Sequence, residues 1–329
     1  MPSLTSINLA HLHLLLNHVP TVGTVVALGL LLLAFARRSD HLKHAGLEVL
    51  FVIAVLTLPA YMTGAAAQQA LRNVPEVSDT AMRLHQDAAI GGFILTELAG
   101  FIAWVALWQS RRRGRPARGL VVAATLMTIA ALAVMGRAAN LGGEIRHPEI
   151  RAAASSGAAD LSTVEAAIDP DDFVAAKIST VMVYSPWVWP AAEAVHFLGL
   201  CLSFGVLLAV NLRILGVMRQ VAFADVHRLL PWGMLGFGAN LITGMMFFVG
   251  QPGQYLASAP FYWKVLFLMI AGANFLYLTV FGKAWAGAGQ HGHTFDASLA
   301  DKAMAVTSLV AWLGVLYAGR MLPFLGRAF

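Results

Sequence analysis

Charged residues and cysteine are both scarce in this sequence. Asp, Glu, Lys and Arg make up only 12% of its 329 residues, whereas a soluble globular domain usually carries about 25%. Hydrophobic residues make up 58%, so the composition excludes a soluble fold and indicates a polytopic membrane protein. The single cysteine, Cys201, lies inside an apolar run, which rules out a disulfide framework within the chain.

The motifs of several enzyme classes are also missing. The sequence has no glycine-rich phosphate loop, no nucleophile elbow, no H-E-x-x-H pair and no dinucleotide-binding signature. No catalytic residues are visible, and whether the chain is an enzyme stays open. The net charge of +5 is concentrated in short loops, so we interpret it as a topology signal and expect no nucleic-acid partner. No Lys or Arg precedes the first apolar run, which argues against a cleaved signal peptide.

Long apolar runs are what the sequence has in abundance. A helix needs about 20 residues to span the hydrocarbon core of a bilayer, and these runs are long enough. They do not alternate as the strands of a membrane barrel do. The sequence therefore predicts an all-α integral membrane protein with eight transmembrane helices. The runs cover residues 14–36, 46–71, 86–109, 118–141, 189–216, 228–250, 261–283 and 302–325.

Basic residues gather in three loops, at residues 37–45, 110–118 and 217–227. Cytoplasmic loops of membrane proteins carry an excess of Lys and Arg, so we place these three loops in the cytoplasm. Both termini then lie on the outer side of the membrane. The 72–85 loop and the long, acid-rich segment 142–188 lie there as well.

The two halves of the chain share polar residues at a nearly constant offset. This pattern predicts a duplicated four-helix unit, and an even number of helices makes the two repeats parallel. The expected domains are residues 1–150, a connecting loop at 151–188 and residues 189–329. Coincidence between simple apolar sequences is the alternative. The paired positions are His18 and His196, Thr63 and Thr243, and His85 and Lys264, separated by 178, 180 and 179 residues.

Histidines cluster where the helices of the first half begin or end on the outer side. The stretch 11–20, His-Leu-His-Leu-Leu-Leu-Asn-His-Val-Pro, opens the first run, His85 begins the third and His147 follows the fourth. Ionisable groups are costly at a membrane helix mouth and tend to mark function. If the helices alternate in direction, these histidines lie on one side of the membrane. Interfacial or helix-bridging histidines would give the same pattern.

The segment 13–20 carries a resemblance to a known family. It resembles the first-helix motif H-P-x-x-V-H-F-P of an uncharacterised bacterial four-helix membrane family. Both histidines and their spacing are kept, whereas Leu14, Asn17 and Val19 stand where the family has Pro, Val and Phe.

Two further segments extend this resemblance to about residues 11–150. Arg83-Leu84-His85 is similar to the family's third-helix histidine, and the segment from Gly142 to His147 is similar to its closing segment. The resemblance implies a four-helix unit of the bacterial cytoplasmic membrane that binds haem. The second half resembles another small bacterial membrane family of unknown role, and both halves are distantly similar to b-type cytochromes and copper-resistance membrane proteins. The residues that carry the second resemblance are His196, Gly199, Gly205, Asn211-Leu212-Arg213, Gly216 and Thr243-Gly244.

A haem b site requires imidazole ligands, an apolar slot and polar or cationic partners for the propionates. No C-x-x-C-H motif for covalent haem is present. We expect His18 and His85 to be the iron ligands, with Arg83, Arg137 and Arg146 near the propionates. A copper or zinc site is an alternative, although the sequence has no Met-rich or Cys-rich cluster.

Five further ionisable residues are candidates for functional roles. His13 either pairs with His147 at a second, shallower metal site or faces water. His196 is an isolated membrane histidine, which is either a ligand or a packing residue. Lys264 stands where the first half has His85, and its ammonium can bind a propionate or a lipid phosphate. Glu97 lies near the middle of the third run, where a carboxyl group is protonated or paired.

These observations favour a membrane-embedded b-type cytochrome subunit with one haem per chain, in the first half. It would carry electrons between a quinol, or another membrane partner, and an acceptor on the outer side. Partners would include membrane lipid, quinone and other subunits of a membrane complex, bound through the outer loop. The alternatives are a non-redox docking subunit and a protein that handles copper.

Overall fold

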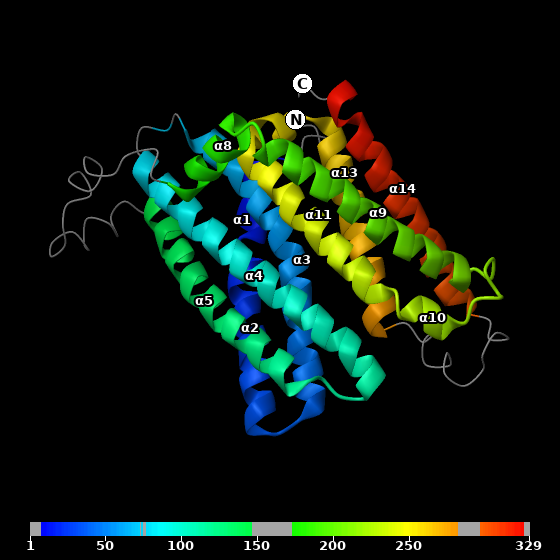
Figure 1. Cartoon of the computed structure of the whole chain (residues 1–329). Helices are drawn as coiled ribbons and strands as arrows, with labels where there is room; N and C mark the ends of the chain where they lie inside the picture. Colours follow the sequence, from blue (N-terminus) through cyan, green and yellow to red (C-terminus); the bar gives the residue numbers. More distant parts are fainter. Residues whose placement is uncertain (1–7, 73, 75–76, 147–172, 282–296, 326–329) are drawn as a thin grey trace, which may run out of the picture. The chain divides into compact units, whose positions relative to one another are not determined.

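The computed structural model describes residues 8–72, 74, 77–146, 173–281 and 297–325 (Figure 1). Within these ranges every regular element is helical and no strand occurs. The chain forms two compact units, Met1–Thr180 and Val181–Phe329. Each unit is described by itself.

The eight predicted membrane helices are confirmed. Across the described ranges, eight helices are long and apolar enough to cross a membrane. The chain is therefore an all-α membrane protein. The spans are Leu9–Ala36, Asp40–Leu71, Asp79–Arg111, Arg118–Ile145, Val188–Ile214, Phe223–Gly250, Ala259–Thr279 and Leu299–Leu322.

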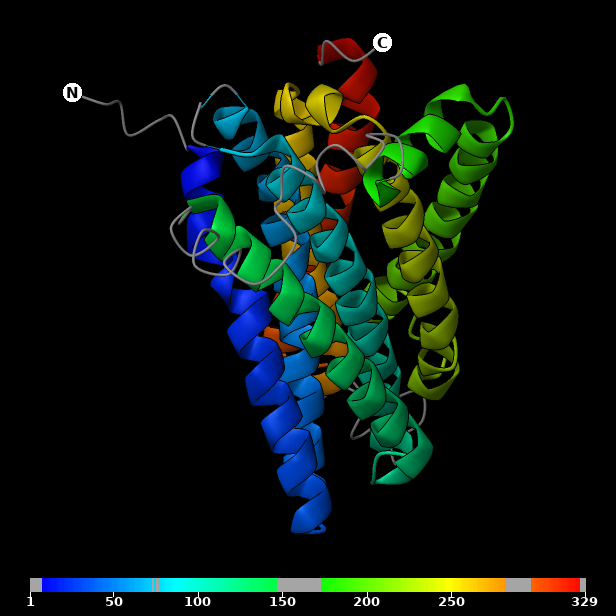
Figure 2. The same cartoon turned by 90° about the vertical axis from the view of Figure 1, so that its left-hand side faces the viewer.

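Unit 1 is a bundle of long helices that run side by side (Figures 1 and 2). The helix α4 packs along α5 and α3, and α3 packs along α2 and α1. A further helix, α8, crosses from unit 1 into unit 2. The elements are α1 (Leu9–Leu16), α2 (His18–Ala36), α3 (Asp40–Leu71), α4 (Asp79–Arg113), α5 (Arg118–Arg146) and α8 (Val174–Tyr184).

Unit 2 is built from two helix pairs, α9 with α11 and α13 with α14. The helix α9 also contacts α14, through a hydrogen bond of 3.1 Å that the amide of Asn211 donates to the hydroxyl of Ser308. The elements are α9 (Val188–Ile214), α10 (Phe223–His227), α11 (Leu230–Gly250), α12 (Pro252–Leu256), α13 (Ala259–Leu276), the π-helix η2 (Tyr277–Phe281) and α14 (Leu299–Leu325).

Two helices begin well before their apolar runs because polar residues cap them. The hydroxyl of Ser39 accepts the backbone N–H of Leu42 at the start of α3, and the hydroxyl of Ser78 accepts that of Ala81 at the start of α4. Each cap is followed by an aspartate in the first turn, where a negative charge is favourable next to the helix dipole. Capping thus carries these helices beyond the apolar core.

The first span is interrupted at Asn17, which separates α1 from α2. Pro20 lies in the first turn of α2. A proline has no backbone N–H, and its ring clashes with the carbonyl four residues earlier, which here belongs to Leu16. The predicted run at 14–36 therefore comprises the end of α1 and all of α2, which together form one span, Leu9–Ala36.

Glycines allow close contacts between neighbouring helices of unit 1. A β-carbon on Gly23 of α2 would overlap the side chain of Ile53 on α3, and one on Gly100 of α4 would overlap Ala54. The hydroxyl groups of Thr24 and Thr96 both lie 3.8 Å from the sulfur of Met135. The middle of this bundle is thus packed by small residues and one thioether.

Candidate functional site

His13 lies on α1 and is partly buried against α3. Its Nδ1 atom is 2.9 Å from the backbone carbonyl oxygen of Ala60 and 3.4 Å from the hydroxyl of Thr63. A carbonyl oxygen can only accept a hydrogen bond, so Nδ1 donates and carries the ring hydrogen. The neutral imidazole therefore keeps its lone pair on Nε2.

His85 lies on α4 and makes the same kind of contact with α5. Its Nδ1 atom is 2.8 Å from the carbonyl oxygen of Ala138. The hydrogen bond again places the ring hydrogen on Nδ1 and the lone pair on Nε2. His13 and His85 are thus in the same tautomer, and in each case a backbone carbonyl of a neighbouring helix fixes it.

Glycines make room for both rings. A β-carbon on Gly64 of α3 would lie 3.2 Å from Cε1 of His13, and one on Gly142 of α5 would lie 3.1 Å from Cε1 of His85. These contacts are tighter than ordinary van der Waals packing, so a larger residue would displace either ring. Each imidazole is held between a carbonyl group and a glycine.

His13 and His85 lie on α1 and α4, and both of these helices pack against α3. We call these two residues the histidine pair. A histidine that binds a metal commonly donates its other ring N–H to a backbone carbonyl, which fixes the tautomer and raises the basicity of the ligating nitrogen. Both members of the histidine pair have this arrangement.

His18, which we expected to be a ligand, lies differently. It is the first residue of α2 and is exposed. Within the described part of the chain it makes no hydrogen bond and no ring contact. Its assignment as a ligand stays a prediction, and the hydrogen bond that holds the His13 ring favours His13 instead. His147, the predicted partner of His13 at a second site, lies outside the described residues.

The three arginines predicted near the propionates have different surroundings. Arg83 is exposed, and its guanidinium carbon lies 5.7 Å from the ring centroid of Phe173. Arg137 is exposed on α5, next to the Ala138 carbonyl that holds His85. The side chain of Arg146 lies outside the described part of the structure. Arg83 and Arg137 thus lie within one turn of the His85–Ala138 contact.

Asp87 is a further polar residue of this region that sequence analysis missed. Its carboxylate accepts the backbone N–H of Val174 at 3.0 Å and that of Ala175 at 3.4 Å, at the start of α8. The first N–H groups of a helix have no partner within the helix, so Asp87 caps α8 and attaches it to α4. The adjacent Phe173 is buried.

In unit 2, His196 on α9 is held by the same kind of contact. Its Nδ1 atom is 2.8 Å from the hydroxyl of Thr243 on α11. Because that hydroxyl donates its own hydrogen to the carbonyl of Ala239 at 2.7 Å, its oxygen accepts from Nδ1. The lone pair of His196 is again on Nε2. A β-carbon on Gly244 would lie 3.7 Å from Cε1 of this ring, in ordinary contact.

Lys264 on α13 is the unit 2 position that sequence analysis paired with His85. Its side chain is partly buried, and its Nζ atom would lie 3.7 Å from a β-carbon on Gly319 of α14. Unit 2 thus has one imidazole whose Nδ1 is held by a neighbouring helix, whereas unit 1 has two.

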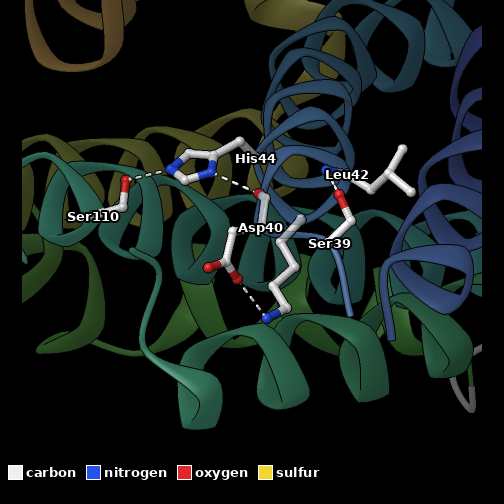
Figure 3. Close-up of polar contacts among 6 residues, drawn as sticks. Ser39, Asp40, Leu42, His44 and Ser110 are labelled. Carbon is white, nitrogen blue, oxygen red and sulfur yellow. Dashed lines mark hydrogen bonds and ion pairs between the residues drawn. The ribbon is translucent and has the colours of Figure 1, made fainter. Parts of the chain in front are cut away.

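His44, at the start of α3, has a contrasting environment that sequence analysis did not anticipate. Figure 3 shows its ring between α3 and α4. Nδ1 lies 2.8 Å from the carbonyl oxygen of Asp40, and Nε2 lies 2.9 Å from the hydroxyl of Ser110. Both ring nitrogens are engaged, so His44 links two helices and has no nitrogen left for a metal.

Glu97, expected near the middle of α4, is partly buried, and its Oε1 atom is buried without a hydrogen-bond partner. It follows Phe93 by one turn on α4, and the ring of Phe93 packs at a tilt of 31° against that of Tyr61 on α3, with centroids 4.9 Å apart. Helical spacing therefore places Glu97 on the side of α4 that faces α3. An ionised carboxylate is costly at this depth.

Among the residues that the structure describes, no group of three or more His, Cys, Asp or Glu side chains comes together to hold a metal ion. A bis-imidazole haem needs only two such side chains, because the porphyrin supplies the other ligands. The donor set of the histidine pair fits that requirement. Comparison with family models, curated proteins and solved structures gives no match.

Proposed function

We propose that unit 1 binds one b-type haem between His13 and His85, and that the protein is a membrane-embedded cytochrome subunit. The carrying observation is that both histidines donate Nδ1–H to a backbone carbonyl, at 2.9 Å and 2.8 Å. This leaves two Nε2 lone pairs in one bundle, which is the donor set that a low-spin haem iron takes. When bound, the haem supplies a one-electron redox centre.

The protein's own residues have distinct roles in this proposal. The carbonyls of Ala60 and Ala138 fix the tautomers and orient the rings. Gly64 and Gly142 leave space for the rings and hold them from the other side. Arg83 and Arg137 supply positive charge next to His85, suited to carboxylates, and Arg146 remains a predicted third cation.

The setting of the site is part of the proposal. We place the protein in the bacterial cytoplasmic membrane, with both termini outside, on the basis of its basic loops. Electrons would pass between a quinol, or another membrane partner, and an acceptor on the outer side. The two units are proposed to be parallel repeats. In support, Thr63-Gly64 and Thr243-Gly244 each accommodate a histidine from a preceding helix.

Absorption spectra of purified variants test the ligand assignment. H13A and H85A should each lose the haem or convert it from low spin to high spin. H18A and H44A should keep the wild-type spectrum, because His18 is exposed and both ring nitrogens of His44 are engaged. A normal low-spin spectrum in H13A, with a changed one in H18A, would show that His18 is the partner of His85.

A further inference from the structure

The four long helices of unit 2 each carry a buried polar atom that has no hydrogen-bond partner among the described residues. Two of these atoms are amide oxygens, which accept hydrogen bonds, and two belong to N–H groups, which donate them. Buried polar atoms are nearly always hydrogen-bonded in folded proteins, because burial without a partner is costly. The atoms are Oδ1 of Asn211 on α9, Oδ1 of Asn240 on α11, Nδ2 of Asn274 on α13 and Nε1 of Trp312 on α14.

These four side chains are enclosed by the helices. Asn211, Asn274 and Trp312 are 0%, 4% and 2% exposed. Asn240 is half-buried, and its Oδ1 atom is buried. The orientation of the Asn240 amide is fixed, because its Nδ2 atom donates to the carbonyl oxygen of Gly236 at 3.0 Å and a carbonyl can only accept. Its Oδ1 atom therefore remains as an acceptor for another group.

Contacts between helices link three of the four residues. Asn211 donates its Nδ2–H to the hydroxyl of Ser308 at 3.1 Å, and Trp312 follows Ser308 by one turn of α14. The ring of Trp312 meets that of Phe237 on α11 edge-on, with centroids 6.1 Å apart. Asn240 follows Phe237 by about one turn of α11. Asn211, Asn240 and Trp312 thus belong to one set of contacts between α9, α11 and α14.

Asn274 reaches the same region from α13. It follows Phe267 by seven residues, so both lie on one face of that helix. A β-carbon on Gly314 of α14 would overlap the ring of Phe267, so this face of α13 packs against α14. The earlier residue Lys264 lies against the later residue Gly319, which shows that α13 and α14 run antiparallel. In this register Asn274 lies level with the serine of α14 that bonds α9.

The balance of donors and acceptors indicates a small neutral ligand. A metal cation requires several oxygen ligands, and the two N–H groups would repel it. An anion would be repelled by the two amide oxygens. Three of the side chains are at most 4% exposed, which favours a very small molecule. Water meets these conditions, because it both donates and accepts and makes about three hydrogen bonds when it is buried in a protein.

We propose that the interior of unit 2 binds water molecules, and that hydrogen bonds through them join its four long helices. Water donates to the Oδ1 atoms of Asn211 and Asn240, and it accepts from Nδ2 of Asn274 and Nε1 of Trp312. The site includes no residue of unit 1. It is therefore independent of the proposed haem, and either proposal can fail without the other.

Hydroxyl-radical labelling of the purified full-length protein tests the proposal. An X-ray pulse converts bound water into radicals that oxidise the adjacent side chain, and mass spectrometry gives the oxidation rate at each residue. Trp104 of unit 1 is the matched control, because it is 2% exposed like Trp312 and is not among the residues with an unpartnered buried atom. Trp312 should be oxidised roughly tenfold faster than Trp104, because water lies beside its indole N–H. N274L, which removes one water contact at similar volume, should lower the rate at Trp312 alone.

Three results would overturn the proposal. The first is an equal oxidation rate at Trp312 and Trp104 in the wild type, a comparison that does not depend on the folding of any variant. The second is a folded N274L protein with an unchanged rate at Trp312. The third is an organic molecule that intact-protein mass spectrometry detects on the wild type and not on N274L, because a larger ligand would then occupy these polar groups.

Discussion

Gly142 lies directly against the imidazole of His85. A β-carbon on this glycine would stand 3.1 Å from Cε1 of the ring, whose Nδ1 is held 2.8 Å from the carbonyl of Ala138. The ring is therefore positioned from two sides by α5 alone. A β-carbon on the adjacent Gly143 would have no neighbouring atom within 4 Å. Gly142 and Gly143 are therefore a matched pair of positions for substitution.

Substitution of Gly142 should change the proposed haem site without unfolding the protein. In G142A the new methyl group displaces the imidazole by a few tenths of an ångström, while alanine favours the helix by about 0.5–1 kcal/mol. We expect a shifted low-spin signal in electron paramagnetic resonance for G142A and an unchanged one for G143A. Identical spectra for both variants would mean that the His85 ring does not contact the cofactor.

His44 should contribute to stability and not to cofactor binding. Replacing it with alanine removes the link between the Asp40 carbonyl and Ser110 (Figure 3), which should cost about 1–3 kcal/mol where the partners are left unsatisfied. Thermal unfolding in detergent measures the loss. The control is H41A, because His41 is exposed one turn earlier. Equal stability of H44A and H41A would contradict the role of His44.

Asp87 should hold the start of α8 on α4. Loss of a capping carboxylate costs about 0.5–2 kcal/mol, so D87A should release the first turn of α8. Amide hydrogen exchange at Val174 and Ala175 should then accelerate, because these two N–H groups bond the Asp87 carboxylate. D87N keeps one acceptor oxygen and should show a smaller effect. If amide hydrogen exchange at Val174 and Ala175 were unchanged in D87A, Asp87 would not be the cap of α8.

The α9–α11 contact should tolerate no side chain at Gly236. A β-carbon there would lie 2.7 Å from the backbone oxygen of Gly199 and 2.7 Å from the backbone nitrogen of Ser203. Backbone atoms cannot move aside as side chains do, so the helices must separate, at a cost of about 1–3 kcal/mol. Thermal unfolding of G236A should show this loss. A β-carbon on Gly205 would have no neighbour within 4 Å, so G205A should be at least as stable as the wild type.

The sequence was sufficient to predict the eight spans, because a long apolar run has few structural alternatives in a bilayer. It did not predict where the capped helices begin. Ser39 and Ser78 extend α3 and α4 by polar contacts that hydropathy does not register. The assignment of His18 as a ligand rested on its place among the outer-side histidines, and it stays a prediction, with the His18 side chain exposed in the structure.

The interhelical contacts could not be read from the sequence. His13 bonds the carbonyl of Ala60, and His85 bonds that of Ala138, across sequence separations of 47 and 53 residues. Every residue has a backbone carbonyl, so the residue type does not reveal which one accepts the hydrogen bond. The glycines at positions 64 and 142 were visible, but which ring lies on each depends on the packing of the helices. Asp87 was missed for the same reason, since its partners are backbone N–H groups of a distant helix.

Haem content per chain tests the central proposal most directly. Purified protein should be assayed by the pyridine haemochrome method against quantitative amino-acid analysis. The account predicts one haem b per chain, because unit 1 has two imidazoles whose Nδ1–H is held by a backbone carbonyl, whereas unit 2 has one imidazole held in a similar way, that of His196. A ratio near two would mean that unit 2 has an unrecognised ligand set. A preparation with no b-type haemochrome and no Soret band would contradict the proposed function.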